Sequence, residues 1–452
     1  MNAPAQPNQA AFVSGSTLRH VAVMTTTASI GLVAIFVVDF LSLLYVSRLG
    51  RPEATAGVGY ATIVLYLMVS INVGLMIAVA ALTARALGAG DREGARRMAG
   101  STLTAMTVCG LIVSLLMLPL LPWLLPKLGA HGESLAVATS FLWITLPSNA
   151  LMALGMGLSG ILRAVGDAKR AMYVTLAGGI VTAGLDPLLI FGFGLGPDGA
   201  AWATVFSRIV FLVIGFRSVL GVHRMIARPS FSALRRDVRP TFAIAAPAIL
   251  TNLANPIANA CFFGIIARFG DQAIAASAII DRLVPVAFGV LFALSGAIGP
   301  ILAQNWGAQR YDRMRRALTD AVGFAAAYVA VAALLLALLR HQIAALFGTG
   351  GETAELVTFF CLIAGPMWLF VANAAFNNLG MPLYSTLFSW GRATLGTVPF
   401  AWLGAQYAGP KGALAGAALG AVLFGIVALV TAYRGITRLE GAAQAAARPS
   451  LA

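Results

Sequence analysis

The stretch from Met98 to Pro126, MAGSTLTAMTVCGLIVSLLMLPLLPWLLP, contains no charged residue and decides the class of fold. A helix needs roughly 20 apolar residues to cross the hydrocarbon core of a bilayer, which is about 30 Å thick. A helix in the core of a soluble enzyme would carry a polar face that repeats every 3.6 residues, and this stretch has none. Residues 321–339 are uncharged as well. These runs indicate an integral membrane protein.

The composition of the whole chain points to the same class. Of its 452 residues, 59% are hydrophobic and 10% are charged, whereas soluble domains average about 25% charged residues. No alternation typical of an outer-membrane β-barrel is present. We therefore predict an all-α integral membrane fold with twelve transmembrane helices. The predicted spans are 18–48, 54–86, 95–124, 134–163, 170–195, 199–220, 240–268, 273–306, 317–346, 353–379, 383–408 and 412–435.

The net charge of +14 is explained by membrane topology. With the N-terminus inside, the cytoplasmic segments hold 21 of the 30 Lys and Arg residues and the external segments hold six. This bias is the positive-inside signature, so we expect both termini in the cytoplasm and the protein in the inner (plasma) membrane of a bacterium. The first sixteen residues lack the basic region of a secretory signal. We expect the lipid bilayer and small molecules as partners, no nucleic acid, and a monomer.

Two pairs of segments reveal an internal repeat. LGAGDREGARR (Leu87–Arg97) matches WGAQRYDRMRR (Trp306–Arg316), and GPDGA (Gly196–Ala200) matches GPKGA (Gly409–Ala413), at offsets of 219 and 213 residues. Because both copies run in the same order and orientation, two six-helix bundles are expected, with the substrate site between them. The predicted domains are a disordered N-terminus (1–16), an N-terminal bundle (17–222), a cytoplasmic linker (223–239), a C-terminal bundle (240–438) and a disordered tail (439–452).

Two acids lie in apolar spans of the first half, at positions where the second half of the repeat has no acid. In the repeat, Asp39 corresponds to Asn259 and Asp186 corresponds to Val398. If the acids were needed for folding, the second half should carry them too, so the asymmetry favours a chemical role. The two acids lie within about one helical turn of each other in depth, at 1.5 Å per residue.

A charged carboxylate in the membrane costs about 2.5–3.5 kcal/mol on insertion scales, so both acids are predicted to bind protons. The hydroxyl of Thr182, four residues before Asp186, shares its helix face. Arg208 is the candidate counter-ion for Asp186, and an acid neutralised by such a structural partner is the alternative reading. The coupling residues are thus predicted to be Asp39, Asp186 and Thr182.

Several uncharged side chains are candidates for a substrate-lining surface. Asn252, Asn255 and Asn259 form one polar stripe, and Asn373 and Asn377 form a second pair; these amides either line a wet cavity or hold helices together. Met152 and Met156 share a helix face and would offer adaptable contacts or plain packing. The three cysteines and four histidines form no metal or catalytic motif. We therefore expect no enzyme, no metal and no cofactor.

Four motifs resemble the multidrug and toxic compound extrusion (MATE) family. They are VVDFLSLLYVSRLG (Val37–Gly50), LRAVGDAKRAM (Leu162–Met172), LDPLLIFGFGLGPDGAAWAT (Leu185–Thr204) and QNWGAQRYDRMRRA (Gln304–Ala317). The resemblance implies a cation-coupled antiporter that exports amphipathic, often cationic, compounds. Asp39 and Asp186 match the family's acids in the first and fifth helices, and the pattern looks like the proton-coupled, DinF-like branch.

The sequence departs from the family at two positions. Thr182 stands where an asparagine is frequent, and Thr27 stands where a proline is common, although its repeat partner is Pro247. Sodium coupling stays open as an alternative. A lipid-linked oligosaccharide flippase is a further alternative, because Arg208, Arg282 and Arg392 lie inside spans and could bind pyrophosphate.

Overall fold

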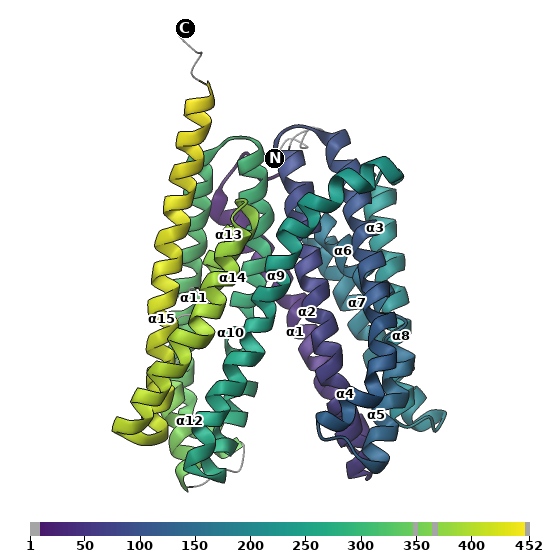
Figure 1. Ribbon diagram of the computed structural model, residues 1–452, viewed down its shortest axis with the longest axis vertical. Helices are drawn as coiled ribbons and strands as arrows, with labels where there is room; N and C mark the ends of the chain where they lie inside the picture. Colours follow the sequence, from purple (N-terminus) through teal and green to yellow (C-terminus); the bar gives the residue numbers. More distant parts are fainter. Residues whose placement is uncertain (1–9, 347–350, 364–368, 448–452) are drawn as a thin grey trace. The chain divides into compact units, whose positions relative to one another are not determined.

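The computed structural model describes residues 10–346, 351–363 and 369–447, and these residues contain helices and no β-strand (Figure 1). Within them, nine continuous helical stretches are long and apolar enough to cross a membrane, and a helix pair bent by 54° gives a tenth. The last stretch is broken at Ala408–Gly409, where the backbone is not helical, so it accounts for two crossings. The remaining predicted span, 353–379, includes residues 364–368, which lie outside the described ranges. The predicted helical membrane fold is confirmed.

The chain forms two compact units whose boundaries fall inside two long helices, α1 (Thr17–Ser47) and α9 (Phe231–Ile266). Residues 30–249 belong to the first unit, and residues 12–29 together with the chain from Leu250 belong to the second. The two boundaries, after Ser29 and after Ile249, are 220 residues apart, the same offset that relates Asp39 to Asn259. The predicted domain limits of 17–222 and 240–438 differ from these units, because each bundle includes the first part of the other bundle's first helix.

The first unit contains the elements from α1 to the start of α9. They are α2 (Pro52–Gly88), α3 (Arg92–Met117), η1 (Leu118–Leu120), α4 (Leu121–Lys127), α5 (Gly132–Thr145), α6 (Asn149–Val165), α7 (Ala168–Pro187), η2 (Leu188–Gly192), α8 (Pro197–Phe216) and η3 (Arg217–His223). Buried aliphatic side chains such as Leu75, Met106 and Leu158 form its core.

Two Gly-Asp pairs end one helix and begin the next in this unit. Gly166 closes α6 in the left-handed region at φ 91°, and Asp167 then accepts a hydrogen bond from the backbone N–H of Arg170 at 3.0 Å, which caps α7. Gly90 and Asp91 do the same between α2 and α3. Glycine tolerates positive φ and aspartate satisfies a free N–H at a helix start, so these motifs dictate tight turns.

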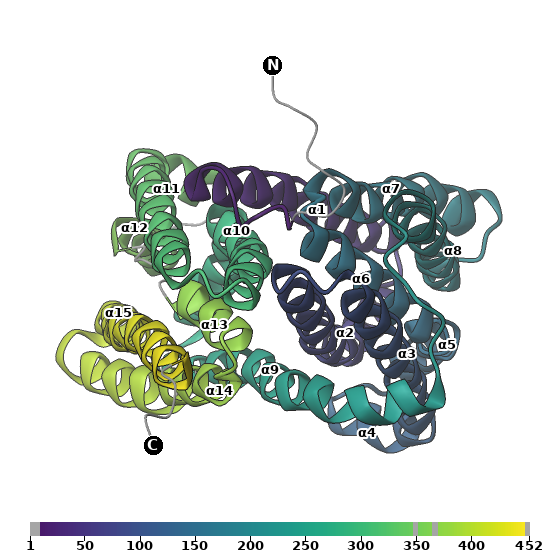
Figure 2. The same ribbon diagram turned by 90° about the horizontal axis from the view of Figure 1, so that it is seen from above.

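The second unit contains η4 (Ala267–Phe269), α10 (Asp271–Gly307), α11 (Tyr311–Leu346), α12 (Gly351–Ile363), α13 (Leu369–Asn378), α14 (Pro382–Gly391), η5 (Arg392–Thr397) and α15 (Val398–Ala447). Seen from above, α13 and α14 lie next to α9, as they do in the side view (Figure 1, Figure 2). Ala254 and Ala258 of α9 pack against Ala393 of η5, so this contact is made by small side chains. α9 begins at Phe231, which makes the second half of the predicted linker 223–239 helical.

The break at Ala408–Gly409 separates two helical arms, 396–404, which begins in η5, and 412–420 of α15. Glycines bring the backbones of these two arms into contact. A Cβ atom added at Gly412 would lie 1.9 Å from the carbonyl oxygen of Gly404, and one at Gly416 would lie 2.0 Å from that of Phe400. At Gly420 the corresponding distance, to the carbonyl oxygen of Gly396, is 1.7 Å. Small residues four apart allow such close approach between membrane helices. We call this contact the glycine interlock.

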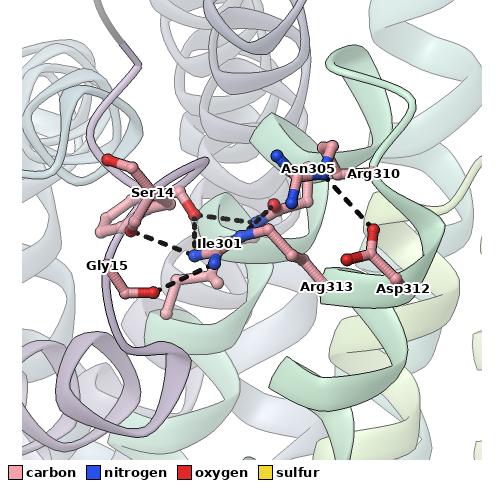
Figure 3. Close-up of polar contacts among 8 residues, drawn as sticks. Ser14, Gly15, Ile301, Asn305, Arg310, Asp312 and Arg313 are labelled. Carbon is pink, nitrogen blue, oxygen red and sulfur yellow. Dashed lines mark hydrogen bonds and ion pairs between the residues drawn. The ribbon is translucent and has the colours of Figure 1, made fainter.

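The N-terminal segment 12–16, predicted to be disordered, packs on the second unit (Figure 3). Arg313 of α11 donates to the carbonyl oxygens of Phe12, Ser14 and Gly15, each at 3.0 Å. The side chain of Phe12 is buried, and its N–H donates to Gln304 at 2.8 Å. The prediction was wrong for these residues, because an arginine on a distant helix supplies the hydrogen bonds. It was also wrong for 439–447, where α15 continues; residues 1–9 and 448–452 lie outside the described ranges.

Candidate functional site

The predicted acids lie on α1 and α7 of the first unit. Glycines let these helices approach: a Cβ atom added at Gly31 would lie 2.5 Å from Oγ1 of Thr175, and one at Gly179 would lie 3.4 Å from Cγ2 of Val38. This packing places Asp39 and Asp186 on adjoining helices. The two carboxyl groups are close enough to interact electrostatically, and their action as a coupling pair stays a prediction.

The two acids differ sharply in their surroundings. Asp186 is 0% exposed, and neither carboxylate oxygen has a well-formed hydrogen bond to any residue that the structure describes. Ser42 of α1 is the polar side chain close enough to interact with it. Asp39, in contrast, is exposed. Burying a carboxyl group without a partner costs much free energy when the group is an anion. The cost is much smaller when the group is protonated and neutral.

Thr182 and Arg208 do not hold Asp186, contrary to the prediction. Thr182 is buried on the same helix, but its hydroxyl donates to the carbonyl oxygen of Gly178 at 3.1 Å, within its own helix. Arg208 of α8 donates to the carbonyl oxygen of Thr145 and to Oγ of Ser148, both at 2.6 Å. These two acceptors flank the bend between α5 and α6, where carbonyl groups lack helical partners. Arg208 thus donates hydrogen bonds to acceptors at the bend between α5 and α6 instead of neutralising Asp186.

The methionine pair on α6 belongs to a packed face. Met156 packs against the core that contains Leu158, and Met152 is half-buried. Beside them lies a polar contact that the sequence did not single out: Asn72 of α2 donates to Asn149 of α6 at 2.8 Å, and both side chains are buried. An amide pair far apart in sequence cannot be recognised from spacing alone.

The predicted amides of the second unit are brought together by α14 and the first residue of η5. Asn255 of α9 accepts a hydrogen bond from the guanidinium group of Arg392, and Asn373 of α13 donates to Oγ of Ser389 at 2.9 Å. Asn377 is buried one turn after Asn373, and Asn259 is exposed one turn after Asn255. The two predicted stripes therefore face one helix that the sequence did not connect to them.

Two charged features of the chain were missed. Asp281 is an acid inside a predicted span, beside Arg282 on α10, and its side chain is exposed. At the turn before α7, His223 contacts Asp167, with Nε2 2.8 Å from Oδ2. Burial raises the pKa of Asp167, but the bonds to His223 and Arg170 outweigh burial and hold that pKa below its ordinary value. No group of three or more metal-binding side chains occurs within the described ranges.

Comparisons with known proteins agree with this architecture. The family model MatE matches residues 28–188 and 247–403. The chain is 31% identical over 417 residues to the FAD transporter of Shewanella oneidensis, covering 90% of this chain and 92% of that one. It is 27% identical over 320 residues to the multidrug export protein MepA of Staphylococcus aureus, covering 70% and 68%.

A solved structure shares the fold. The MATE transporter VcmN of Vibrio cholerae, in its bent form, superposes with a TM-score of 0.89 at 23% sequence identity, covering 94% of this chain and 98% of that one. The family model matches the larger part of the chain, in both halves of the repeat. The resemblance predicted from the four motifs is confirmed, and the chain belongs to the MatE family of multi-pass membrane transporters.

Proposed function

We propose that this transporter exports amphipathic cationic compounds in exchange for protons. The observation that carries the proposal is the contrast between the two acids of the first unit. Asp186 is fully buried and has no well-formed hydrogen bond among the residues that the structure describes, whereas Asp39 on the adjoining helix is exposed. One carboxyl group is exposed on the surface of its helix, and the other is stable mainly as a neutral acid.

The exchange follows from competition at this pair. Two close carboxyl groups share a proton, because ionising both at once is costly. A bound organic cation supplies the missing positive charge and displaces the proton, and proton binding from the outside expels the cation. Coupling then requires only that substrate and proton prefer different conformations of the carrier. The similarity to MepA, a multidrug export protein, supports this class of substrate.

The same proposal includes the topology, the membrane location, the oligomeric state and the coupling ion. The basic residues favour cytoplasmic termini and insertion in a bacterial inner membrane. We take the transporter to act as a monomer in the bilayer, with no cofactor and no nucleic-acid partner. Protons are preferred over sodium because a sodium site needs several hard oxygen ligands, and the described interiors of α9 and α13 contribute amides and hydroxyls only.

Transport in inverted membrane vesicles tests the proposal. A pH gradient imposed with sodium absent on both sides is expected to drive export of ethidium, and collapsing the gradient is expected to stop it. Export that requires a sodium gradient and ignores the pH gradient would replace the proton with sodium as coupling ion. Vesicles in which neither gradient moves ethidium would refute cation antiport.

A second candidate function is export of a phosphate-bearing aromatic compound. The protein 31% identical to this chain is named an FAD transporter, and FAD carries a pyrophosphate group. Arg392, inside a predicted span of the second unit, forms its hydrogen bond with a neutral amide. Proton-driven uptake of FAD into the same inverted vesicles, with ethidium unmoved, would favour this function.

A further inference from the structure

One face of α14, continued by the first residue of η5, carries a polar stripe through an otherwise apolar segment. Ser385, Ser389 and Arg392 follow at i, i+4 and i+7, so they lie on one side of the helix. Each meets a neighbouring helix: Ser385 bonds Thr251 of α9 at 3.3 Å, and Ser389 bonds Asn373 of α13. Arg392 bonds Asn255 of α9 one turn further. We call these side chains the α14 seam.

The charge of the α14 seam is not balanced. Arg392 donates to one amide oxygen, and it forms no ion pair with any carboxylate in the part of the chain that the structure describes. A guanidinium group offers five N–H donors in a flat fork, and a single neutral acceptor leaves most of them available. Arg392 is half-buried, and a positive charge partly removed from water without a counter-charge is costly, so an anion arriving here would be favoured.

Arg208 of the first unit shows what a structural arginine looks like in the same chain. It is 5% exposed, and its N–H groups satisfy the carbonyl oxygen of Thr145 and the hydroxyl of Ser148 at a helix break. Arg392 caps no such break: its partner is a side chain on another helix. Arg208 and Arg392 therefore differ in their partners: two acceptors at a helix break hold Arg208, whereas one side-chain amide among the described residues holds Arg392.

The surroundings of Arg392 hold it in place. Nε1 of Trp390 donates to the carbonyl oxygen of Leu250 at 3.0 Å, and Ala393 packs against two alanines of α9. Arg392 also begins η5, a π-helical segment, and such segments are frequent at functional sites. A side chain fixed by its neighbours loses little entropy when a ligand binds.

Unsatisfied acceptors lie on α13, which contacts the α14 seam at Ser389. The side-chain oxygens of Asn373 and Asn377, one turn apart on α13, have no hydrogen-bond partner among the described residues, although the two side chains are only 9% and 4% exposed. The side-chain amide of Asn373 donates a hydrogen bond to Ser389, which belongs to the polar stripe. The α14 seam thus combines a cationic fork with acceptors that need N–H or O–H donors, a combination suited to a polar organic anion.

We propose that Arg392, positioned by Asn255, binds the phosphate of a soluble phosphate-bearing aromatic compound such as FAD. The proposal rests on the second candidate function and names its recognition site. Phosphate oxygens fit the guanidinium fork in a bidentate way that an ammonium group does not reproduce. The flavin or nucleotide base supplies N–H donors of the kind that the asparagine oxygens lack.

Binding to the detergent-purified full-length protein tests the site without requiring transport. FAD is the probe, and riboflavin, which has the same flavin ring and no phosphate, is its matched control. Wild-type protein is expected to bind FAD at least 10-fold more tightly than riboflavin. R392Q is expected to weaken FAD binding by about 10- to 100-fold and to leave riboflavin binding unchanged, because a charge-assisted hydrogen bond is lost. R392K is expected to restore only part of the affinity.

Arg282, the third arginine inside a predicted span, provides the control for general positive charge. R282Q removes a charge from α10 and is expected to keep wild-type affinity for FAD. Equal affinities of wild-type protein and R392Q for FAD would overturn the proposal, as would equal weakening by R282Q. Size-exclusion profiles and thermal unfolding confirm that each variant is folded, and R392K keeps the test decisive if R392Q is unstable.

Membrane lipid is the other source of phosphate. Phosphatidylglycerol added to the micelles is expected to compete weakly with FAD, and Arg392-dependent binding of this lipid with no binding of FAD would overturn the soluble source. Failure of the proton-coupled function is recognised separately, in vesicles, by the absence of gradient-driven export from wild-type protein.

Discussion

Replacing Gly420 with alanine probes the glycine interlock that supports η5 and Arg392. The added Cβ atom would lie 1.7 Å from the carbonyl oxygen of Gly396 in η5, where an ordinary contact begins at 3.4 Å. The two arms must therefore separate by up to about 1.7 Å at this point. The obstacle is backbone, which cannot rotate away. Overpacking of this kind costs about 1–3 kcal/mol, and the upper part of the range applies here.

Gly323 provides the matched control for this substitution. It lies within α11, and a Cβ atom added there would have no neighbour within 4 Å. Alanine at this position should stabilise the helix by about 0.5–1 kcal/mol. The two variants should therefore differ by about 1.5–4 kcal/mol, with Gly420→Ala the less stable. Unfolding by SDS, followed by tryptophan fluorescence, measures the difference; equal midpoints would refute the close contact between the arms.

The remaining predictions concern three other contacts. The pKa of Asp167 is lowered, so its carboxylate stabilises the folded protein fully above its unfolded pKa of about 3.9. This contribution declines below that pH and is lost only as the pH falls through the lower folded-state pKa. Asp167→Asn should therefore lower the unfolding midpoint at pH 7 and lower it by a smaller amount at pH 3. Arg313→Ala should expose residues 12–16 to amide hydrogen exchange, whereas Arg310→Ala, which removes a neighbouring side chain bonded to Asp312, should not. Arg208→Gln should lower thermal stability, because it removes the hydrogen bond to the carbonyl oxygen of Thr145. Thr182→Ala should leave the pH dependence of transport unchanged, because the Thr182 hydroxyl bonds within its own helix. A large shift of that pH dependence by Thr182→Ala would support the predicted contact with Asp186.

The fold could be predicted from the sequence because the bilayer imposes simple rules. Uncharged runs such as 98–126 have one stable form in lipid, and the repeated Gly-Pro-X-Gly-Ala turns show how the runs are paired. The boundaries of the units could not be predicted in this way. They fall inside α1 and α9, where no change of composition marks the point at which a helix passes from one unit to the other.

The site was predicted in part. Asp39 and Asp186 stand out because isolated charges in apolar spans are rare, and their comparison with Asn259 and Val398 needs only the repeat. Partners were harder to predict: Arg208 was assigned to Asp186 by proximity in sequence, but it serves the bend between α5 and α6. The α14 seam joins amides more than 100 residues apart, a contact that depends on tertiary packing.

Substrate-induced proton release from purified protein tests the coupling role of the two acids most directly. Ethidium is added to wild-type protein in a weakly buffered solution that contains a pH-sensitive dye. Wild-type protein should release protons on binding ethidium, and both Asp39→Asn and Asp186→Asn should abolish the release while remaining folded. Asp281→Asn, which removes an intramembrane acid from the second unit, should release protons as wild-type protein does. Release of wild-type size from both Asp39→Asn and Asp186→Asn would contradict proton coupling through this pair.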